Sequence, residues 1–312
     1  AEIHSVCYGN SRFIATGVTY DDDFESHSLI LTSTDGLSWT VTRSIIREEP
    51  QGVTYGNGNF VIVGDYYSTA GEYFSLILTS ATGSSWTRRA VGVSTSATLY
   101  GVAYGNGLYL AVGEFGTVFT ASSISSWALR DVERFDRLND VAYGNGSFLV
   151  CGEAGLVLST SDGMAWNSAA SGVTTDLNSI RFLNGRFWTV GDGGTVLSST
   201  AGAAWSGVTT PVPSNLNTID YSNGLYVIMG DGGAILTAGD ANTFTQSNLD
   251  LKPGLNGVAF GSGWVAVGDV GAVLTSADGQ AWTTRNSLTD AQLRSVTFGS
   301  GESILGTSLI SG

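Results

Sequence analysis

Hydrophobic and polar residues follow one pattern that repeats along the whole chain. The pattern is clearest at 99–127, where LYGVAYGNGLYLAVGEFGTVFTASSISSW divides into short apolar segments separated by turn residues. Residues 99–104, 108–112 and 117–121 are expected strands, and a fourth strand begins at Trp127. The Gly-Asn-Gly turn supplies residues that tolerate a positive φ, as tight hairpins require. The pattern predicts four antiparallel strands in each unit.

The spacing of these units predicts the fold. The aromatic residue that opens the first turn occurs at Tyr8, Tyr55, Tyr104, Tyr143, Phe182, Tyr221, Phe260 and Phe298. From Tyr104 onward, successive positions are 38 or 39 residues apart. A period near forty with four short strands per repeat is typical of a β-propeller. We therefore expect an all-β chain that forms one propeller domain over 1–312, with repeats starting near 3, 51, 99, 138, 177, 216, 255 and 293.

The last repeat is incomplete. Residues 293–301 supply a first strand and its turn, and ESILG and SLISG can supply a second strand and a short third one, but no closing tryptophan follows. We favour eight blades with the last one truncated, and the alternative is seven blades with an extra C-terminal hairpin. That hairpin would pack outside the ring or pair with another subunit. An unpaired strand edge has to be covered, and strand exchange between molecules is one way to cover it.

Composition excludes several classes of partner and site. The chain has 27 acidic and 13 basic residues, a formal net charge of −14, and a single lysine, Lys252. Nucleic-acid binding requires a basic surface, and anionic membranes also attract basic proteins. No apolar run approaches the length of a membrane span. We therefore expect no nucleic-acid partner and no membrane insertion. Cys7 and Cys151 stand in different repeats that a ring keeps apart, so we expect no disulfide between them.

The segments that end in tryptophan share a turn sequence. It is clearest at 32–39 (TSTDGLSW), 159–166 and 275–282, with weaker copies at 79–86 and 198–205. These segments resemble the Asp-box, or BNR-repeat, propellers, which include sialidases, sortilin-type receptors and photosystem II assembly factors. The family usually has Ser-x-Asp-x-Gly-x-Thr-Trp, whereas here the acid adjoins the glycine, as Asp35, Asp162 and Asp278 do. In the family this box is a stabilising turn remote from the active face, so the resemblance implies a fold and not one activity.

Two inserted loops mark one face of the expected propeller. The connection between the second and third strands is short in most repeats, but residues 19–28 (TYDDDFESHS) and 65–75 (DYYSTAGEYFS) are longer. The two loops belong to neighbouring blades and should therefore meet. Aromatic rings flanked by acids and hydroxyls suit the recognition of carbohydrate or protein. The candidate ligand-binding residues in these loops are Tyr20, Asp22, Phe24, His27, Tyr66, Tyr67, Tyr73 and Phe74.

An acidic residue follows the second strand in six repeats. The six are Asp65, Glu114, Glu153, Asp192, Asp231 and Asp269, and by repeat equivalence they should surround the mouth of the channel on the same face. Such acids can hold a cation or accept hydrogen bonds from sugar hydroxyls. Alternatively, an acid is simply a favourable turn residue before x-Gly. Asp21, Asp22 and Asp23 offer oxygen ligands for Ca²⁺ without the usual alternating spacing, and we expect no other cofactor.

No set of residues indicates a particular reaction. The only histidines are His4 and His27, which argues against a His-dependent triad or a multi-His metal site. A sialidase-like site would need three arginines around a carboxylate, and no spacing among the arginines singles out such a set. The acids offer pairs for glycoside hydrolysis, but their equivalence identifies none of them.

We therefore expect a non-enzymatic recognition or adhesion module on an extracellular or virion surface. It would bind a glycan or a protein through the face with the inserted loops. Two alternatives belong to other classes of protein. One is a polysaccharide-active hydrolase or lyase that uses a carboxylate pair at the channel mouth. The other is a structural subunit of a surface assembly or filament that self-associates through its C-terminal strands.

Overall fold

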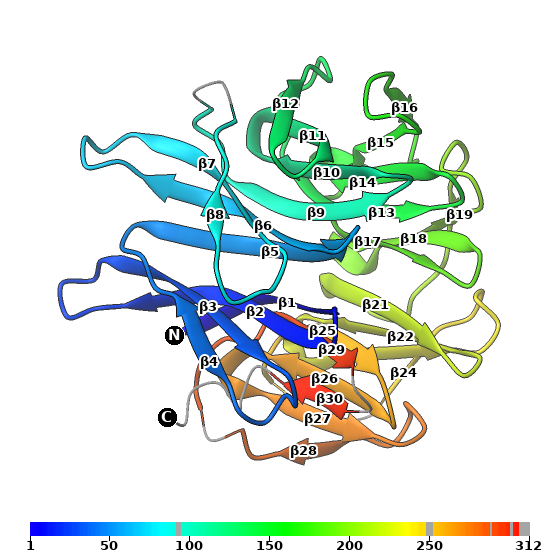
Figure 1. Cartoon of the computed structure of the whole chain (residues 1–312). Coiled ribbons are helices and arrows are strands. Elements are labelled where there is room, and N and C mark those ends of the chain that lie inside the picture. The colour runs from blue at the N-terminus through cyan, green and yellow to red at the C-terminus, as the bar shows by residue number, and fades with distance from the viewer. Residues whose placement is uncertain (92–94, 248–251, 288, 300–301, 306–312) are drawn as a thin grey trace.

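The computed structural model describes residues 1–91, 95–247, 252–287, 289–299 and 302–305. Within this part of the chain, seven four-stranded antiparallel sheets are arranged in a ring, and a two-stranded sheet follows them (Figure 1). The strands of each sheet pair in chain order, so every blade is a simple meander. The predicted β-propeller with four-stranded blades is confirmed.

Each blade runs from an inner strand at the channel to an outer strand at the rim. The inner strands are β1 (Glu2–Gly9), β5 (Glu48–Gly56), β9 (Leu99–Gly105), β13 (Leu138–Gly144), β17 (Leu177–Leu183), β21 (Leu216–Ser222) and β25 (Leu255–Phe260). The second strands are β2 (Arg12–Tyr20), β6 (Asn59–Tyr67), β10 (Leu108–Gly113), β14 (Ser147–Gly152), β18 (Arg186–Gly191), β22 (Leu225–Gly230) and β26 (Trp264–Gly268).

The third and fourth strands are shorter in most blades. The third strands are β3 (Ser26–Ser33), β7 (Tyr73–Ser80), β11 (Val118–Ser123), β15 (Val157–Thr160), β19 (Val196–Ser199), β23 (Ala234–Ala238) and β27 (Val273–Ser276). The outer strands are β4 (Thr40–Arg43), β8 (Thr87–Arg88), β12 (Ser126–Arg130), β16 (Asn167–Ala169), β20 (Ser206–Gly207), β24 (Thr245–Gln246) and β28 (Thr283–Arg285).

The connection from the second to the third strand differs between the blades. Blades three to seven use single 3-10 turns, namely η1 (Glu114–Gly116), η2 (Glu153–Gly155), η3 (Asp192–Gly194), η4 (Asp231–Gly233) and η5 (Asp269–Gly271). In blades one and two the strands continue instead as long hairpins, β2–β3 and β6–β7, which project to the same side of the ring (Figure 1). The 3-10 turns are the longest helical segments described, so none of the described helices could span a membrane.

The hydrophobic core is divided into layers between neighbouring blades. Between blades one and two, Ile14 and Ile30 pack against Phe60, Ile62 and Leu78, and all five side chains are fully buried. The second strands are apolar on both faces because each face meets another blade. Burial of these branched and aromatic side chains, at about 25 cal/mol per Å² of apolar surface, is the main stabilising contribution.

A glycine at the end of several inner strands lets the next blade approach closely. The aromatic ring that opens the following blade's turn lies directly over this glycine, as Tyr143 does over Gly105. A Cβ atom at Gly105 would overlap that ring. The same contact joins Gly9 to Tyr55 and Gly299 to Tyr8. The repeated aromatic residue of the sequence is therefore an inter-blade contact.

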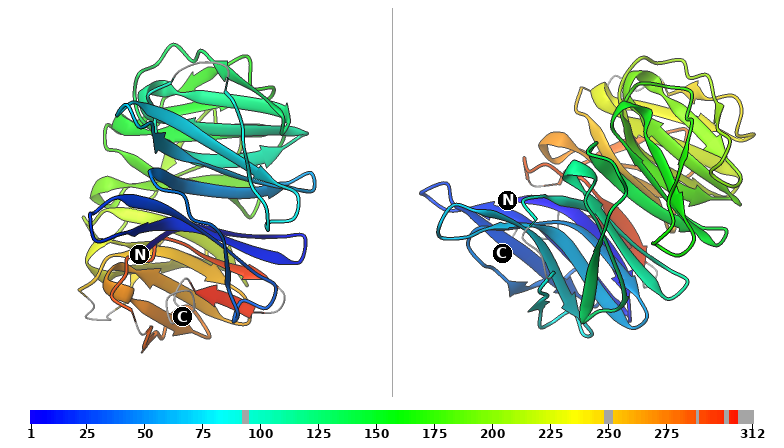
Figure 2. Two further views of the ribbon diagram at one scale, coloured as in Figure 1. Left: turned by 60° about the vertical axis from the view of Figure 1, so that its left-hand side comes forward. Right: turned by 90° about the horizontal axis from the view of Figure 1, so that it is seen from above.

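The C-terminal hairpin is part of the ring and lies between the last blade and the first. β29 (Val296–Gly299) pairs with β30 (Glu302–Leu305) and lies between β25 and β1. Just before it, the Arg294 amide donates to the carbonyl of Ile3 at 3.1 Å, and both views of Figure 2 show the first and last strands side by side. The chain thus has seven four-stranded blades and an extra C-terminal hairpin, as the second predicted architecture states. The expectation that this hairpin packs outside the ring is wrong, and SLISG lies outside the described residues.

The tryptophan turns are held by a compact hydrogen-bond network. In the first blade the Ser33 hydroxyl accepts from the Gly36 amide at 2.7 Å, and the Trp39 indole donates to the Gly36 carbonyl at 2.9 Å. The Asp35 carboxylate accepts from the amides of Leu37 and Ser38 at 2.9 and 2.8 Å. These amide donors lower the pKa of Asp35 because they stabilise its charged form. The acid of this turn therefore has a structural function.

Candidate functional site

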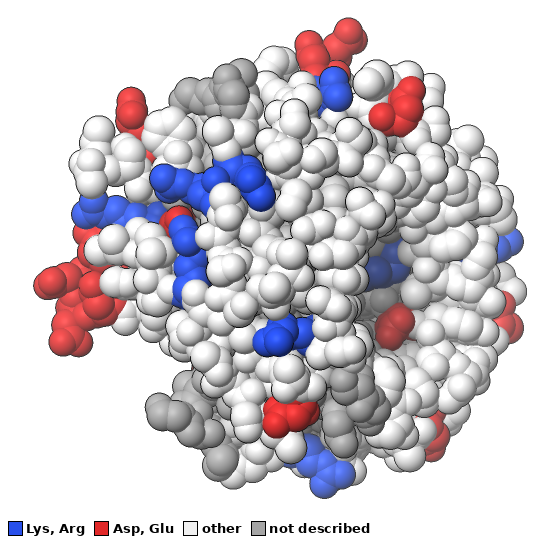
Figure 3. All heavy atoms as spheres, viewed as in Figure 1, with Lys and Arg blue, Asp and Glu red and all other residues white. Residues whose placement is uncertain are grey.

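One face of the ring carries the two inserted loops and the set of acids that the sequence singles out. We call it the loop face, defined by the ends of the β2–β3 and β6–β7 hairpins and by η1–η5. In the space-filling view, acidic side chains gather at the projecting hairpin ends on the left, and basic side chains lie on the surface between them (Figure 3).

Most of the predicted acids hold polar side chains of the inner strands in place. In four blades the carboxylate of the acid accepts a hydrogen bond from the side chain of the second residue of the inner strand, which follows a buried leucine. The pairs are Tyr100–Glu114 at 2.9 Å, Asn178–Asp192 at 2.9 Å, Asn217–Asp231 at 2.9 Å and Asn256–Asp269 at 2.8 Å. Glu153 instead accepts from the backbone amide of Arg137 at 3.2 Å. The acids therefore fix the mouth of the channel, whether or not they also contact a ligand.

Asp65 differs from the other five acids. Blade two has a long hairpin where the later blades have a 3-10 turn, so Asp65 lies within β6 and is 3 % exposed. Burial, together with the charges of Glu49 and Glu114, raises its pKa to about 7. The prediction that Asp65 belongs to an accessible ring of acids is wrong, because the register of β6 turns its side chain inward.

The two projecting hairpins are joined through one residue of the segment between the blades. The Arg47 amide donates to the Ser26 carbonyl at 2.6 Å, and the Tyr67 amide donates to the Arg47 carbonyl at 2.9 Å. The guanidinium of Arg47 also makes a two-bond contact with Glu25, at 2.9 and 3.0 Å. The two hairpins are therefore held at a fixed separation.

A groove of about 340 Å³ lies between these hairpins. It is lined by Tyr20, Phe24, Glu25, Ser26, Arg47, Glu49, Tyr67, Ser68, Thr69 and Gly71. Phe24 is 87 % exposed and Tyr20 49 % exposed, so two aromatic rings are presented to solvent beside charged groups. The structure thus brings together three of the predicted residues, Tyr20, Phe24 and Tyr67.

The other predicted aromatic residues do not line the groove and pack within the β6–β7 hairpin. The rings of Tyr66 and Phe74 are stacked with centroids 5.2 Å apart, and Arg88 lies over Tyr66 at 4.4 Å. Tyr73 packs on Tyr67 with a centroid distance of 3.7 Å and is 42 % exposed. Much of the aromatic surface that the sequence offers to a ligand is therefore used within the β6–β7 hairpin.

The acidic end of the first hairpin is organised by its own backbone. The Asp21 carboxylate accepts from the amides of Asp23 and Glu25, each at 3.0 Å, and contacts the His27 ring at 3.0 Å. Asp22 is exposed. Within the described residues, no three His, Cys, Asp or Glu side chains converge as a metal site would require. The calcium site at Asp21, Asp22 and Asp23 stays a prediction.

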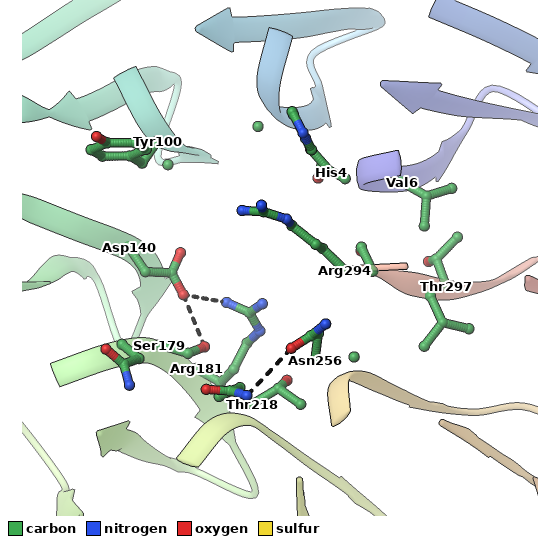
Figure 4. A pocket seen from close by; sticks show the side chains of 18 of the residues that line it. His4, Val6, Tyr100, Asp140, Ser179, Arg181, Thr218, Asn256, Arg294 and Thr297 are labelled. Carbon is green, nitrogen blue, oxygen red and sulfur yellow. Dashed lines mark hydrogen bonds and ion pairs between the residues drawn. The ribbon is translucent and has the colours of Figure 1, made fainter. Parts of the chain in front are cut away.

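The central channel contains charged residues that the sequence analysis did not select. A cavity of about 500 Å³ is lined by the inner strands of all seven blades and by the segment around β29. Asp140 and Arg181 lie on one wall, and His4 and Arg294 reach into the cavity from the other side (Figure 4). Asp220 also lines the cavity. Arg181 and Asp140 form an ion pair at 2.7 Å. Burial raises the pKa of Asp220 and lowers that of His4.

A comparison of the repeats would have revealed these residues. The residue before the turn-opening aromatic is small in six repeats, namely Cys7, Thr54, Ala103, Ala142, Ala259 and Thr297. Arg181 and Asp220 occupy this position in the other two repeats. Charged residues at a position that otherwise holds small ones are not explained by the blade architecture. Their departure from the repeat pattern is the feature of the sequence that points to the channel.

Comparison with family models and with curated proteins gave no match for this chain. Solved structures share its fold. A structure described as YCF48 bound to D1 peptide is 16 % identical, with a TM-score of 0.64, and the match covers 89 % of this chain and 92 % of that one. YCF48 from Cyanidioschyzon merolae is 14 % identical, with a TM-score of 0.64 over 90 % of this chain and 96 % of that one.

Two further structures extend this likeness beyond YCF48. The computationally designed Ika8 protein is 9 % identical, with a TM-score of 0.69 over 99 % of this chain and 94 % of that one. The WD40 β-propeller domain of Doa1 is 12 % identical, with a TM-score of 0.57 over 84 % of this chain and 90 % of that one. At these identities the likeness establishes the propeller fold and no more.

Proposed function

We propose that this protein is a non-enzymatic recognition module that binds a segment of another protein in the groove between the β2–β3 and β6–β7 hairpins. The observation that carries the proposal is the exposure of Phe24 beside Tyr20 in a groove whose walls are fixed by Arg47. Exposure of a phenylalanine ring to water is unfavourable, and aromatic side chains are enriched in the cores of protein interfaces. Glu25, Glu49 and Arg47 supply polar contacts around it.

The comparisons support a protein partner over a glycan. One similar structure is described as bound to a peptide, and another is a WD40 propeller domain. A glycan stays the second ligand class of the proposal, because aromatic rings beside acids also suit sugar rings. The extracellular or virion-surface location and the Asp-box relationship remain parts of the proposal that composition and the tryptophan turns support. No arrangement of the described residues argues for the hydrolase or filament alternatives.

Replacement of Phe24 by alanine should weaken binding of a protein segment. A peptide is first selected from a random library on the intact chain, and its dissociation constant is then measured for the F24A and Y67A variants. Loss of a buried aromatic anchor costs about 2 kcal/mol, which is about a thirtyfold weaker dissociation constant. The measurement is titration calorimetry at constant salt.

F135A provides a matched control for this experiment. Phe135 is 86 % exposed and does not line the groove, so its loss should leave the affinity unchanged. Equal affinities of F24A, Y67A and the intact chain would place the binding site elsewhere. A glycan array probed with the same proteins tests the second ligand class. Glycan binding that depends on Phe24, without any selected peptide, would replace the protein partner by a carbohydrate.

A further inference from the structure

The channel cavity holds two guanidinium groups from different parts of the ring. Arg181 belongs to β17, and Arg294 precedes β29, so the two residues approach the cavity from different walls (Figure 4). Their side chains are 47 and 48 % exposed although both lie inside the ring. This exposure is to the space of the channel. The cavity is distinct from the groove between the hairpins and shares none of its lining residues.

Arg181 is held firmly and still has unused donors. Its Nη1 donates to Asp140 at 2.7 Å and to the Ile180 carbonyl at 3.0 Å. Asp140 in turn accepts from the amides of Val141 and Ile180 and from the Ser179 hydroxyl, at 2.8 to 3.0 Å. Within the described part of the chain, Nε and Nη2 of Arg181 have no acceptor. The carboxylate thus orients the guanidinium and leaves one of its edges to the cavity.

Arg294 is less constrained by protein acceptors. Its Nε donates to the Gln292 side chain at 3.0 Å, and its Nη2 lies 3.8 Å from a Glu2 carboxylate oxygen, beyond hydrogen-bond distance. No described residue accepts from Nη1. Its positive charge therefore faces the cavity with only partial compensation.

The blade architecture does not require either arginine. The six repeats with small residues at the position of Arg181 also form a strand there. Asparagine stands at the position of Arg294 in four consecutive blades, as Asn139, Asn178, Asn217 and Asn256. Placing charges inside a protein is unfavourable unless they are compensated. Asp140 and Asp220 offset much of the charge of Arg181, whereas the Glu2 carboxylate that faces Arg294 lies 3.8 Å away. The charge of Arg294 in particular is therefore better explained by a ligand than by stability.

We propose that the channel binds a small oxyanion, a carboxylate or a phosphate, between Arg181 and Arg294. Guanidinium groups present parallel N–H donors that match the oxygen pairs of both anions. Hydroxyl donors from Thr218, Ser295 and Thr297 line the same cavity.

Of the two mouths of the channel, the one opposite the loop face has fewer acidic residues in its turns and is the less repulsive approach for an anion. Its turns between first and second strands, such as 9–11, 56–58, 105–107 and 144–146, contain no acidic residue. The mouth on the loop face, in contrast, is surrounded by Glu114, Glu153, Asp192, Asp231 and Asp269.

The test measures the binding of inorganic phosphate and of succinate, separately, to the intact chain and its R294Q variant in a low-salt chloride buffer. Titration calorimetry should show binding of at least one probe to the intact chain and at least tenfold weaker binding to R294Q. The probe that binds more tightly distinguishes phosphate from carboxylate. Binding of neither probe, or equal binding by both proteins, would overturn the proposal.

R285Q is the matched control. Arg285 lies at the rim in β28, is exposed and donates to Thr275 at 2.8 Å, so its loss removes the same charge far from the channel. R285Q should bind as the intact chain does, and a similar loss in both variants would indicate a non-specific charge effect. The Arg181 Nε–Hε resonance supplies a second readout, because it should shift when the oxyanion binds, and an unmoved resonance would contradict the proposed site.

Discussion

Replacement of Gly105 by alanine should destabilise the protein by about 3 kcal/mol, as overpacked cores do. The added Cβ would overlap the Tyr143 ring, which is held between blades three and four. Neither side can yield easily, because Gly105 ends an inner strand and Tyr143 begins the next blade's turn. The free energy of unfolding from urea titration, followed by tryptophan fluorescence, measures the effect.

Gly207 supplies the control for this substitution. It is exposed in β20, and an added Cβ would meet only a Leu197 methyl at 3.9 Å. G207A should therefore change the free energy of unfolding by no more than about 0.5 kcal/mol. If G105A were as stable as G207A, the aromatic–glycine contact would not be the constraint that holds neighbouring blades together.

Replacement of Asp65 by asparagine should stabilise the protein at pH 8. The pKa of this buried carboxyl rises from an ordinary 3.8 to about 7, so the folded state favours the protonated form. The stabilising contribution of protonated Asp65 is therefore complete below about pH 4 and is lost as the pH rises through 7. This change in pKa corresponds to at most about 4 kcal/mol of the free energy of unfolding. D65N should recover a large part of that free energy at pH 8.

The test compares urea unfolding of D65N and the original chain at pH 5 and pH 8. The stability gain of D65N should be larger at pH 8, because asparagine is neutral at both values. D231N removes the same charge from an exposed member of the acid set, so it separates the effect of burial from that of net charge. A gain in D231N equal to that in D65N would attribute the effect to the overall charge of −14.

The repeat pattern predicted the strands of each blade because local chemistry decides them. The expected strands at 99–104 and 108–112 correspond to β9 and β10, and the Gly-Asn-Gly turn joins them. The aromatic residue at the turn was correctly recognised as a repeat marker. Its partner could not be predicted, since Gly105 and Tyr143 meet only through the packing of two blades.

The candidate site was predicted only in part, because local chemistry places its loops but not the packing of their side chains. The sequence pointed to the loops that form the groove, but periodicity cannot tell which aromatic rings face a ligand and which pack on each other. Tyr67 lines the groove, while its neighbour Tyr66 points the other way and stacks on Phe74. Alternation along β6 separates the two, and the residue that joins the hairpins, Arg47, belongs to the segment between the blades.

The sequence by itself determined the all-β fold, the four strands per blade and the position of the two insertions, because these follow from turn chemistry and hydrophobic spacing within about forty residues. Only the tertiary structure decided three other features. It placed the C-terminal hairpin between β25 and β1, turned Asp65 inward, and brought Arg181 and Arg294 into one cavity. The first and the third depend on ring closure, which joins residues far apart in the chain, and the second depends on the register of the β6–β7 hairpin.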